Sequence, residues 1–211
     1  MPKGLGLPAP HSVAPRILLI RHGQPHIALS PRTSHRGFAE YIDAYEDAGL
    51  SPSNLPPEEV RDLARELDHV FTSGRRRSHE SAATLAPHAE LVADPLFDEA
   101  PLASPPIPLL SMKVPKWAVV SRILWHAGFH PEIENPRAAA KRAVQAAEIL
   151  IARAKQKGVA ALVAHGYFNW MIGRVLQKRG FTRTGSHQAR YWNTVIYERQ
   201  DETRKNDRDP A

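Results

Sequence analysis

The sequence predicts a three-layer α/β fold in which helices flank a mostly parallel β-sheet. Short apolar segments typical of buried strands alternate along the chain with longer segments of helical periodicity. Strands separated by helices favour parallel pairing, with the helices covering the faces of the sheet. The predicted strands are residues 16–20, 69–72, 91–93, 159–164 and 191–198. The predicted helices are residues 37–46, 57–67, 77–85, 137–157 and 168–178.

The longest predicted helix, residues 137–157, is amphipathic. Its small and apolar side chains recur at helical spacing, with Lys141, Arg142, Glu148 and Arg153 between them. The predicted buried positions are Ala140, Ala143, Val144, Ala147, Leu150, Ile151 and Ala154. A helix with one such face packs on a sheet, which supports the layered architecture.

The length of the chain predicts one domain. A chain of 211 residues with 42% hydrophobic side chains can bury a single substantial core. We expect this domain over residues 16–199, between a flexible N-terminal segment at 1–15 and a flexible C-terminal tail at 200–211. Residues 101–136, rich in proline and tryptophan, are interpreted as a small helical cap insertion. We expect its tryptophans to be packed rather than to contact a substrate.

Composition excludes several classes of protein. The absence of cysteine excludes disulfides, zinc–thiolate centres, iron–sulfur clusters and thiol nucleophiles. Because the apolar runs are too short for a membrane span or a signal peptide, we expect no membrane partner and a cytoplasmic location. The net charge of +6 favours anionic partners. Scattered arginines, rather than a basic and aromatic element, argue against a nucleic-acid partner, and the oligomeric state stays open.

Two of the predicted strands each end in a histidine followed by a glycine. The first ends in Arg21-His22-Gly23 and the second in His165-Gly166. If these strands are parallel neighbours, both histidines lie at the rim of the sheet formed by the strand carboxyl ends, where ligand sites form in α/β proteins. The glycines permit a sharp turn and leave room for a ligand beside the backbone. The matched pair therefore predicts a functional site.

Basic residues at the same rim indicate a phosphate site. The guanidinium of Arg21 offers a planar fork of donors suited to phosphate oxygens. Its charge also disfavours protonation of His22, which leaves the imidazole a lone pair for attack. The run Arg75-Arg76-Arg77 follows another predicted strand and opens a helix, whose N-terminal amides favour anions. Spacing alone does not choose among these three arginines.

A phosphate site of this kind needs a proton donor for the leaving oxygen of the substrate. The acidic turn at residues 94–99 follows the predicted strand at 91–93, so it belongs to the same rim. Within this turn Asp98 and Glu99 are both candidates.

Over most of its length the chain resembles the histidine phosphatase superfamily, which includes cofactor-dependent phosphoglycerate mutases and many small phosphatases. The family hallmark, Arg-His-Gly at the end of the first strand, corresponds to Arg21-His22-Gly23. A later family strand that ends in His-Gly corresponds to His165-Gly166. The resemblance implies the α/β fold and phosphoryl-transfer chemistry together.

Further segments carry the same resemblance. The family segment Ser-Asp-Leu-x-Arg-Ala-x-x-Thr-Ala is similar in register to residues 73–82, which selects Arg77 as the second phosphate-binding arginine. The family acid lies in a short turn after the next strand, where Glu99 stands at the better position. Asn193 and Thr194 are similar to residues of the family's final strand.

The resemblance implies a metal-independent phosphatase that uses no cofactor and forms a phosphohistidine. In this mechanism His22 attacks phosphorus, and Glu99 protonates the departing alkoxide. The expected catalytic residues are His22, Glu99, Arg21, Arg77 and His165. The expected substrate-binding residues are Arg21, Gly23, Arg77, His165 and Gly166. We expect a small phosphorylated substrate, with a phosphoprotein left open.

Several positions depart from the family pattern. After the hallmark, Pro25 stands within the run where the mutases carry Glu-Ser or Glu-Thr, Ala28 replaces a pocket Asn, and Gly74 replaces Asp. These changes favour a phosphatase over a phosphoglycerate-type mutase. They also leave open a phosphate-recognising interaction module with impaired catalysis. A metal hydrolase is disfavoured, because the glycine and proline between His22 and His26 prevent a helical metal-binding pair.

Overall fold

The computed structural model describes residues 14–28 and 32–199, which form one six-stranded sheet in the order β3-β2-β4-β1-β6-β5. β3, β2, β4 and β1 pair in parallel, and β6 and β5 are added by antiparallel pairing. The strands are β1 (Arg16–Arg21), β2 (His69–Thr72), β3 (Glu90–Ala93), β4 (Val159–Ala164), β5 (Thr182–Thr184) and β6 (Thr194–Glu198). The predicted mostly parallel α/β fold is confirmed. The segments predicted to be flexible, 1–15 and 200–211, lie outside the described residues apart from positions 14 and 15.

Helices accompany the sheet along the described chain. They are α1 (His35–Asp47), α2 (Glu58–Ala64), α3 (Arg76–Leu85), the 3₁₀ helix η1 (Pro95–Phe97), α4 (Val114–His126), α5 (Pro136–Lys157) and α6 (Gly166–Lys178). All five predicted helices are present, with their ends shifted by a few residues. No helix within the described ranges has both the length and the apolarity required to cross a membrane.

Two strand predictions need correction. β5 was not predicted because its three residues, Thr182 to Thr184, are polar or charged and all exposed, so they show no apolar pattern. The last strand begins at Thr194 rather than at residue 191. Trp192 has a left-handed backbone conformation, with φ of 59°, which extended strand pairing does not accommodate.

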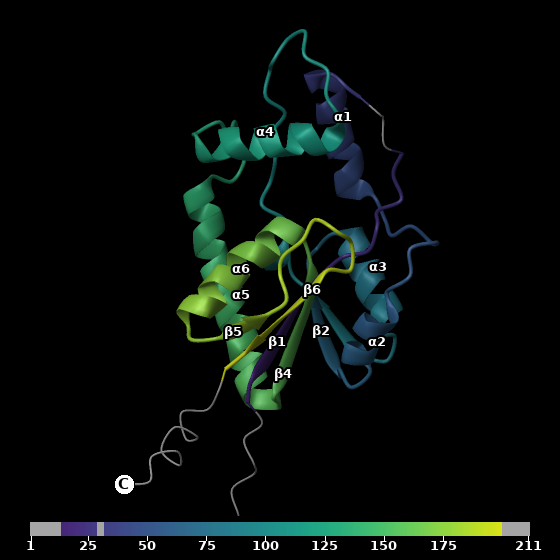
Figure 1. The fold of residues 1–211 in the computed structure, drawn as a ribbon, viewed down its shortest axis with the longest axis vertical. Coiled ribbons are helices and arrows are strands. Elements are labelled where there is room, and N and C mark those ends of the chain that lie inside the picture. The colour runs from purple at the N-terminus through teal and green to yellow at the C-terminus, as the bar shows by residue number, and fades with distance from the viewer. Residues whose placement is uncertain (1–13, 29–31, 200–211) are drawn as a thin grey trace, which may run out of the picture.

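The sheet has a hydrophobic core on each face because successive side chains of a strand point to opposite sides. In β1, Ile17 and Leu19 join the core beneath α5 and α6, whereas Leu18 and Ile20 join the core beneath α2 and α3. Figure 1 shows these helix pairs on the two sides of the sheet. The result is the predicted three-layer arrangement.

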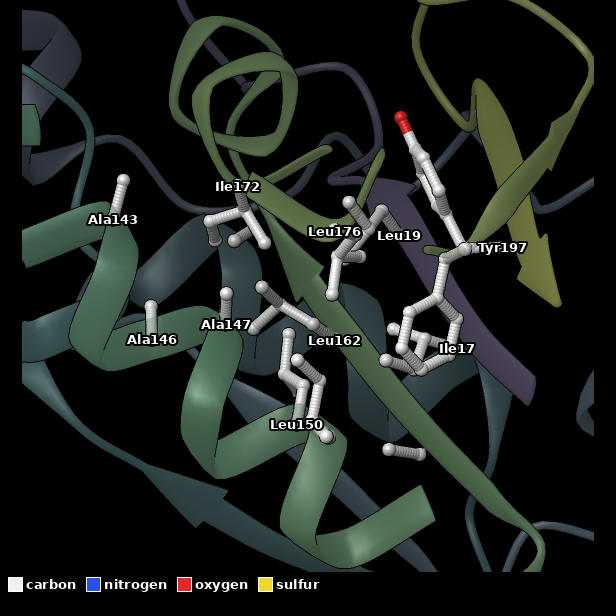
Figure 2. Packing of buried hydrophobic residues seen from close by; sticks show 14 of the residues in the cluster. Ile17, Leu19, Ala143, Ala146, Ala147, Leu150, Leu162, Ile172, Leu176 and Tyr197 are labelled. Carbon is white, nitrogen blue, oxygen red and sulfur yellow. The ribbon is translucent and has the colours of Figure 1, made fainter. Parts of the chain in front are cut away.

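The buried face of α5 differs in part from the predicted one. Figure 2 shows small alanines of α5 and the larger Leu150 against Leu162 of β4. The buried positions are Ala139, Ala143, Ala146, Ala147, Leu150, Ile151 and Ala154. Ala140 and Val144 are exposed, so their predicted burial was wrong. At this end of α5 the face turns toward the cap, because Ala139 packs with Trp125.

The segment between η1 and α5 forms the cap and carries α4. α4 packs on α1 through Trp117, which is fully buried with Phe38 and donates from Nε1 to the Thr33 carbonyl at 2.8 Å. Trp125, at the other end of α4, is also fully buried. Figure 1 shows α1 and α4 together beyond the carboxyl ends of the parallel strands. Both tryptophans are packing residues, as predicted, and α1 joins the cap over the rim of the sheet.

Candidate active site

His22 and His165 meet at the carboxyl-end rim of the sheet. β1 and β4 are parallel neighbours whose last residues, Arg21 and Ala164, are paired, so the next residue of each strand lies at the same rim. The backbone N–H of His22 donates to the Ala164 carbonyl at 2.8 Å, and the two imidazole centroids are 5.1 Å apart. Each histidine is only 1% exposed. The two matched strand ends therefore build one buried pair of imidazoles.

The surroundings of His22 select one tautomer of its ring. Nδ1 lies 2.7 Å from the Gly23 carbonyl oxygen, which can only accept, so Nδ1 carries the proton and Nε2 keeps a lone pair. The Tyr45 hydroxyl lies 3.3 Å from Nε2 and donates to it. Burial, reinforced by the charges of Arg77 and Arg21, lowers the pKa of His22 well below its ordinary value. His22 is therefore a neutral imidazole with a lone pair on Nε2.

Arg21 flanks His22, and its guanidinium is positioned by neighbouring residues. It donates from Nη1 to the Ala189 carbonyl, and its Cζ lies 4.8 Å from the centroid of the Tyr191 ring. Its Nε is buried and has no hydrogen-bond partner among the described residues. A Cβ at Gly166 would lie 3.3 Å from Cδ and 3.4 Å from Nε of Arg21. The glycine after His165 therefore makes room for this arginine.

Arg77 lies beside His165 and is fully buried. Its Nη1 donates to the carbonyls of Tyr45 at 2.7 Å and Glu46 at 3.2 Å, and its Nη2 lies 3.5 Å from Nδ1 of His165. The guanidinium also covers the Tyr45 ring, with Cζ 4.3 Å from the centroid. Like that of Arg21, its Nε is buried without a partner in the described part of the chain.

The two arginines that precede Arg77 make other contacts. Arg75 forms ion pairs with two carboxylates, at 2.8 and 3.3 Å. Arg76 has a side chain that is 70% exposed and pairs at 2.6 Å with Glu80, one turn along its own helix. Of the three arginines, Arg77 is the one whose guanidinium contacts His165. It is also the arginine selected by the register of the family segment.

His165 uses both ring nitrogens for contacts with side chains. Nε2 lies 2.8 Å from the Ser73 hydroxyl, and Nδ1 faces Arg77. Because the arginine can only donate, Nδ1 is the acceptor and Nε2 carries the proton. Burial, followed by the nearby His22 and Arg77, lowers the pKa of His165 well below its ordinary value. His165 is thus a neutral donor that Ser73 holds at the rim.

Glu99 is half-buried and lies at the N-terminus of α6, the helix that begins directly after His165. Its Oε1 accepts from the backbone N–H groups of Phe168 at 2.9 Å and Ala100 at 3.0 Å, and its Oε2 accepts from Tyr167 at 3.3 Å. Burial raises the pKa of the Glu99 carboxyl, although the Arg122 charge and these three N–H groups act in the opposite direction. Such an environment suits a carboxyl group that carries a proton for transfer.

Asp98, the other candidate acid, is held by the segment before α3. Its Oδ1 accepts from the Gly74 N–H at 2.8 Å, and its Oδ2 lies 3.3 Å from Nε of Arg75. A Cβ at Gly74 would lie 3.3 Å from Oδ1, so the glycine found in place of the family Asp allows this close approach. Asp98 therefore connects two loops of the rim, and Glu99 is the stronger candidate for the proton donor.

The predicted room for a ligand beside Gly23 is filled by other side chains. A Cβ at Gly23 would lie 2.5 Å from Cδ1 of Leu50 and 2.6 Å from Cζ2 of Trp192. The Gly23 N–H donates to the Ser81 hydroxyl at 2.9 Å, and its carbonyl accepts from His22. Gly23 thus serves close packing and the orientation of the imidazole. Ala28, at the position of the family Asn, is exposed.

Two tyrosines that were not predicted, Tyr45 and Tyr191, lie beside His22, and a third, Tyr41, packs against Tyr45. The rings of Tyr45 and Tyr191 have centroids 6.2 and 6.0 Å from the His22 centroid, and Tyr41 lies 5.7 Å from Tyr45. Burial raises the pKa of Tyr45, so its hydroxyl keeps the proton that it shares with Nε2. Tyr41 and Tyr45 stand four residues apart on a predicted helix, a spacing more typical of a packed face than of a site.

These groups together favour an anionic ligand that can be attacked by nitrogen. The guanidinium groups of the half-buried Arg21 and the fully buried Arg77 lie near a neutral imidazole, and each has a buried Nε–H without a partner in the described residues. Buried polar groups are normally paired, so unpaired donors of this kind are suited to a bound anion. The half-buried Glu99 carboxyl, whose pKa is raised, completes the set.

Comparison with known proteins identifies the family. The family model of the histidine phosphatase superfamily (branch 1) matches residues 17–208, so the chain belongs to this superfamily. A comparison with curated proteins found no match. Membership supports phosphatase activity in general, in an enzyme of phosphatase or mutase type.

Solved structures of low sequence identity share the fold. The product of an open reading frame from Mycobacterium tuberculosis is 19% identical, with 86% of this chain and 89% of that chain covered and a TM-score of 0.54. Ecdysone phosphate phosphatase from Bombix mori, solved with tungstate, is 12% identical, with 86% and 88% covered and a TM-score of 0.52. Phosphoserine phosphatase from Entamoeba histolytica, solved with 3-phosphoglyceric acid, is 13% identical, with 86% and 89% covered and a TM-score of 0.51.

Proposed function

We propose that this protein is a metal-independent phosphatase that hydrolyses phosphate monoesters through a phosphohistidine formed at His22. The observation that carries the proposal is the neutral His22, fixed in one tautomer, close to two arginines whose buried Nε–H groups have no partner among the described residues. Recognition of phosphate alone would require the cations but no nucleophile. Membership in the superfamily and the phosphatase names of two similar structures support hydrolysis as the outcome.

In the first step Nε2 of His22 attacks phosphorus in line with the leaving oxygen. The N–P bond forms as the P–O bond to the leaving group breaks, and the Glu99 proton passes to the departing oxygen. The Nδ1–H that donates to the Gly23 carbonyl keeps the ring oriented and disperses the positive charge that develops on the imidazole. The products of this step are a free alcohol, a phosphohistidine and an ionised Glu99.

In the second step water attacks the phosphohistidine. Ionised Glu99 takes a proton from the water as the new P–O bond forms and the N–P bond breaks. The reaction returns His22 to its neutral state, restores the proton on Glu99 and releases inorganic phosphate. The raised pKa of Glu99 suits both roles, because the same group must hold the proton at first and recover it later.

Guanidinium groups supply the charge stabilisation that phosphoryl transfer requires. Arg21 and Arg77 would donate to the equatorial phosphate oxygens, and the His165 Nε2–H would turn from Ser73 to the phosphate. A divalent cation at the same place would be repelled by the two arginines. The burial of His22, which is 1% exposed, favours a small phosphorylated substrate over a folded phosphoprotein.

The test is hydrolysis of p-nitrophenyl phosphate by the wild-type protein and by His22→Ala in the presence of EDTA. We expect wild-type activity to survive chelation and to fall by roughly a thousandfold or more in the variant, because loss of a nucleophile is among the largest single effects on catalysis. His88→Ala, which changes an exposed histidine, is the matched control.

Two other results would contradict the proposal. Loss of wild-type activity on chelation would identify a metal enzyme. Binding of inorganic phosphate without turnover of any phosphomonoester would instead favour a phosphate-recognising interaction module.

A further inference from the structure

The loop that carries Glu99, residues 96–101, is held by two arginines from two different helices. We call it the acid loop. Arg142 of α5 and Arg122 of α4 donate to the carbonyls of five of its six residues. Arg142 donates to Leu96 at 3.0 Å, Asp98 at 2.6 Å and Glu99 at 3.5 Å, and Arg122 donates to Ala100 at 2.7 Å and Pro101 at 3.2 Å.

Besides the acid loop, Arg142 contacts a carboxylate and an aromatic ring that fix its guanidinium. Its Nε and Nη2 donate to the Glu134 carboxylate at 2.9 and 2.6 Å, so its charge is balanced by a partner outside the acid loop. Its Cζ lies 4.0 Å from the centroid of the Phe168 ring, and its side chain is only 17% exposed. The planar fork of an arginine can make these contacts at once, which a lysine ammonium cannot.

Arg122 acts on Glu99 through its charge as well as through the loop. Its Cζ lies 4.1 Å from the centroid of the Tyr167 ring and 4.6 Å from that of Trp125. It is the strongest of the influences that lower the pKa of Glu99 against the raising effect of burial. Arg122 therefore links the cap helix to the carboxyl group at the N-terminus of α6.

The distribution of these hydrogen bonds indicates that the two arginines fix the position of Glu99, rather than only stabilising the fold. The two arginines together donate to every carbonyl from residue 98 to residue 101, so these hydrogen bonds surround residue 99. A buried carbonyl that loses its donor is destabilised by about 1–3 kcal/mol, so the loop would move to recover partners in water. A shift of about 1 Å in a reacting group can reduce the rate by about a hundredfold.

We propose that Arg142 and Arg122 are positioning residues that hold the Glu99 carboxyl against the leaving oxygen of the substrate. The inference rests on the proposed function, in which Glu99 gives its proton to that oxygen as the P–O bond breaks. An alkoxide is a poor leaving group and depends on this proton, whereas p-nitrophenolate leaves readily without it. Displacement of the acid loop should therefore slow alkyl phosphates far more than p-nitrophenyl phosphate.

The test compares kcat/KM for β-glycerophosphate and p-nitrophenyl phosphate in the wild-type protein, Arg142→Met, Arg122→Met and Glu99→Gln. We expect either arginine variant to lose about 10- to 100-fold on the alkyl substrate and less than about threefold on the aryl substrate. Glu99→Gln should show the same preference more strongly. The ratio of the two values on one preparation does not depend on how much of the variant is folded.

Arg153→Met is the matched control. Arg153 lies on the same helix as Arg142, has a side chain of similar exposure, 20% against 17%, and forms one ion pair, with Asp68 at 3.0 Å. We expect this variant to keep the wild-type ratio, because Arg153 makes no contact with the acid loop among the described residues.

Three results would overturn the inference. Equal losses on both substrates in the arginine variants would mean a general structural role, and unchanged activity on both would mean no role. A Glu99→Gln variant without the alkyl-selective loss would show that another group donates the proton, while leaving the phosphatase itself intact. If the wild-type protein hydrolysed neither substrate, the proposed function would fail and this inference with it.

Discussion

Single residues at the rim decide the protonation state that the chemistry needs. An imidazole can attack phosphorus only through a free lone pair, and His22 has one because Nδ1 is engaged with Gly23 and because Arg21 and Arg77 oppose a second proton. The same two cations are the groups suited to bind the phosphate. In the proposed mechanism, phosphate binding and the neutral state of His22 therefore depend on the same two charges.

The buried neutral histidines should make stability depend on pH. The pKa values of His22 and His165 are lowered in the folded state, so below about pH 6.5 the unfolded chain binds protons that the folded chain does not. The free energy of unfolding should therefore fall as the pH is lowered. Each histidine should contribute about 1 kcal/mol between pH 7.5 and 5.5, whereas Glu99, with a raised pKa, acts in the opposite direction at lower pH.

Urea unfolding of the wild-type protein and of His22→Asn at these two pH values measures the effect. The wild-type protein should lose about 1 kcal/mol more than the variant on acidification. His88→Asn, at an exposed position, is the control. Equal losses in the wild-type protein and His22→Asn would mean that His22 is protonated in the folded state.

Residues at strand ends were the part of the site that the sequence could predict. Arg21, His22 and His165 follow from two strands that end alike, because parallel neighbours bring such positions together. The selection of Arg77 needed the family register, since its neighbours have the same side chain. Tyr45 could not be predicted, because its contact with His22 depends on how α1 packs over the sheet, which no local pattern specifies.

At the scale of the elements, α1 contacts the ring nitrogen of His22 that is the proposed nucleophile. Its last turn places the Tyr45 hydroxyl on Nε2 of His22, its carbonyls on Arg77 and the Glu46 carboxylate on Arg75. The phosphorus of a substrate must approach the same Nε2. The last turn of α1 therefore competes with a phosphate for the groups that would bind it.

Tyr45→Phe tests this competition. The change removes the hydroxyl from Nε2 but keeps a ring beneath Arg77, and a hydrogen bond of this kind contributes about 1 kcal/mol. Inorganic phosphate should then inhibit hydrolysis of p-nitrophenyl phosphate about fivefold more strongly, as measured by its inhibition constant. Tyr41→Phe, one turn earlier on α1, is the control. Weaker inhibition in Tyr45→Phe would show instead that the hydroxyl donates to the bound phosphate.

Predictions for whole elements succeeded where an apolar pattern was strong. The buried strands and the long helices follow from their periodicity, whereas β5 has three exposed residues and thus no apolar pattern to recognise. The burial of Ala140 and Val144 was wrong because the packing of Trp125 against Ala139 turns the start of α5 toward the cap. Long-range packing of this kind is not encoded in the spacing of one helix.

In the whole molecule, different layers supply the different groups of the proposed reaction. The sheet positions both histidines and Arg21, α3 supplies Arg77, and the cap and α5 hold the acid loop. Superfamily membership and the three-layer fold account for the positions of the histidines and Arg21 on the sheet and of Arg77 on α3. The connection of the cap to Glu99 through Arg122 depends on how α4 packs against the acid loop, which the sequence pattern does not specify.

The central claim is that His22 becomes phosphorylated during turnover. The most direct measurement mixes the protein with a ³²P-labelled phosphomonoester, quenches the reaction within milliseconds, and locates the label by peptide mapping under alkaline conditions, which preserve phosphohistidine. We expect a label on His22 in the wild-type protein, no label in His22→Ala, and a label still on His22 in Glu99→Gln. Turnover without any labelled histidine, or a label on His165 in place of His22, would contradict it.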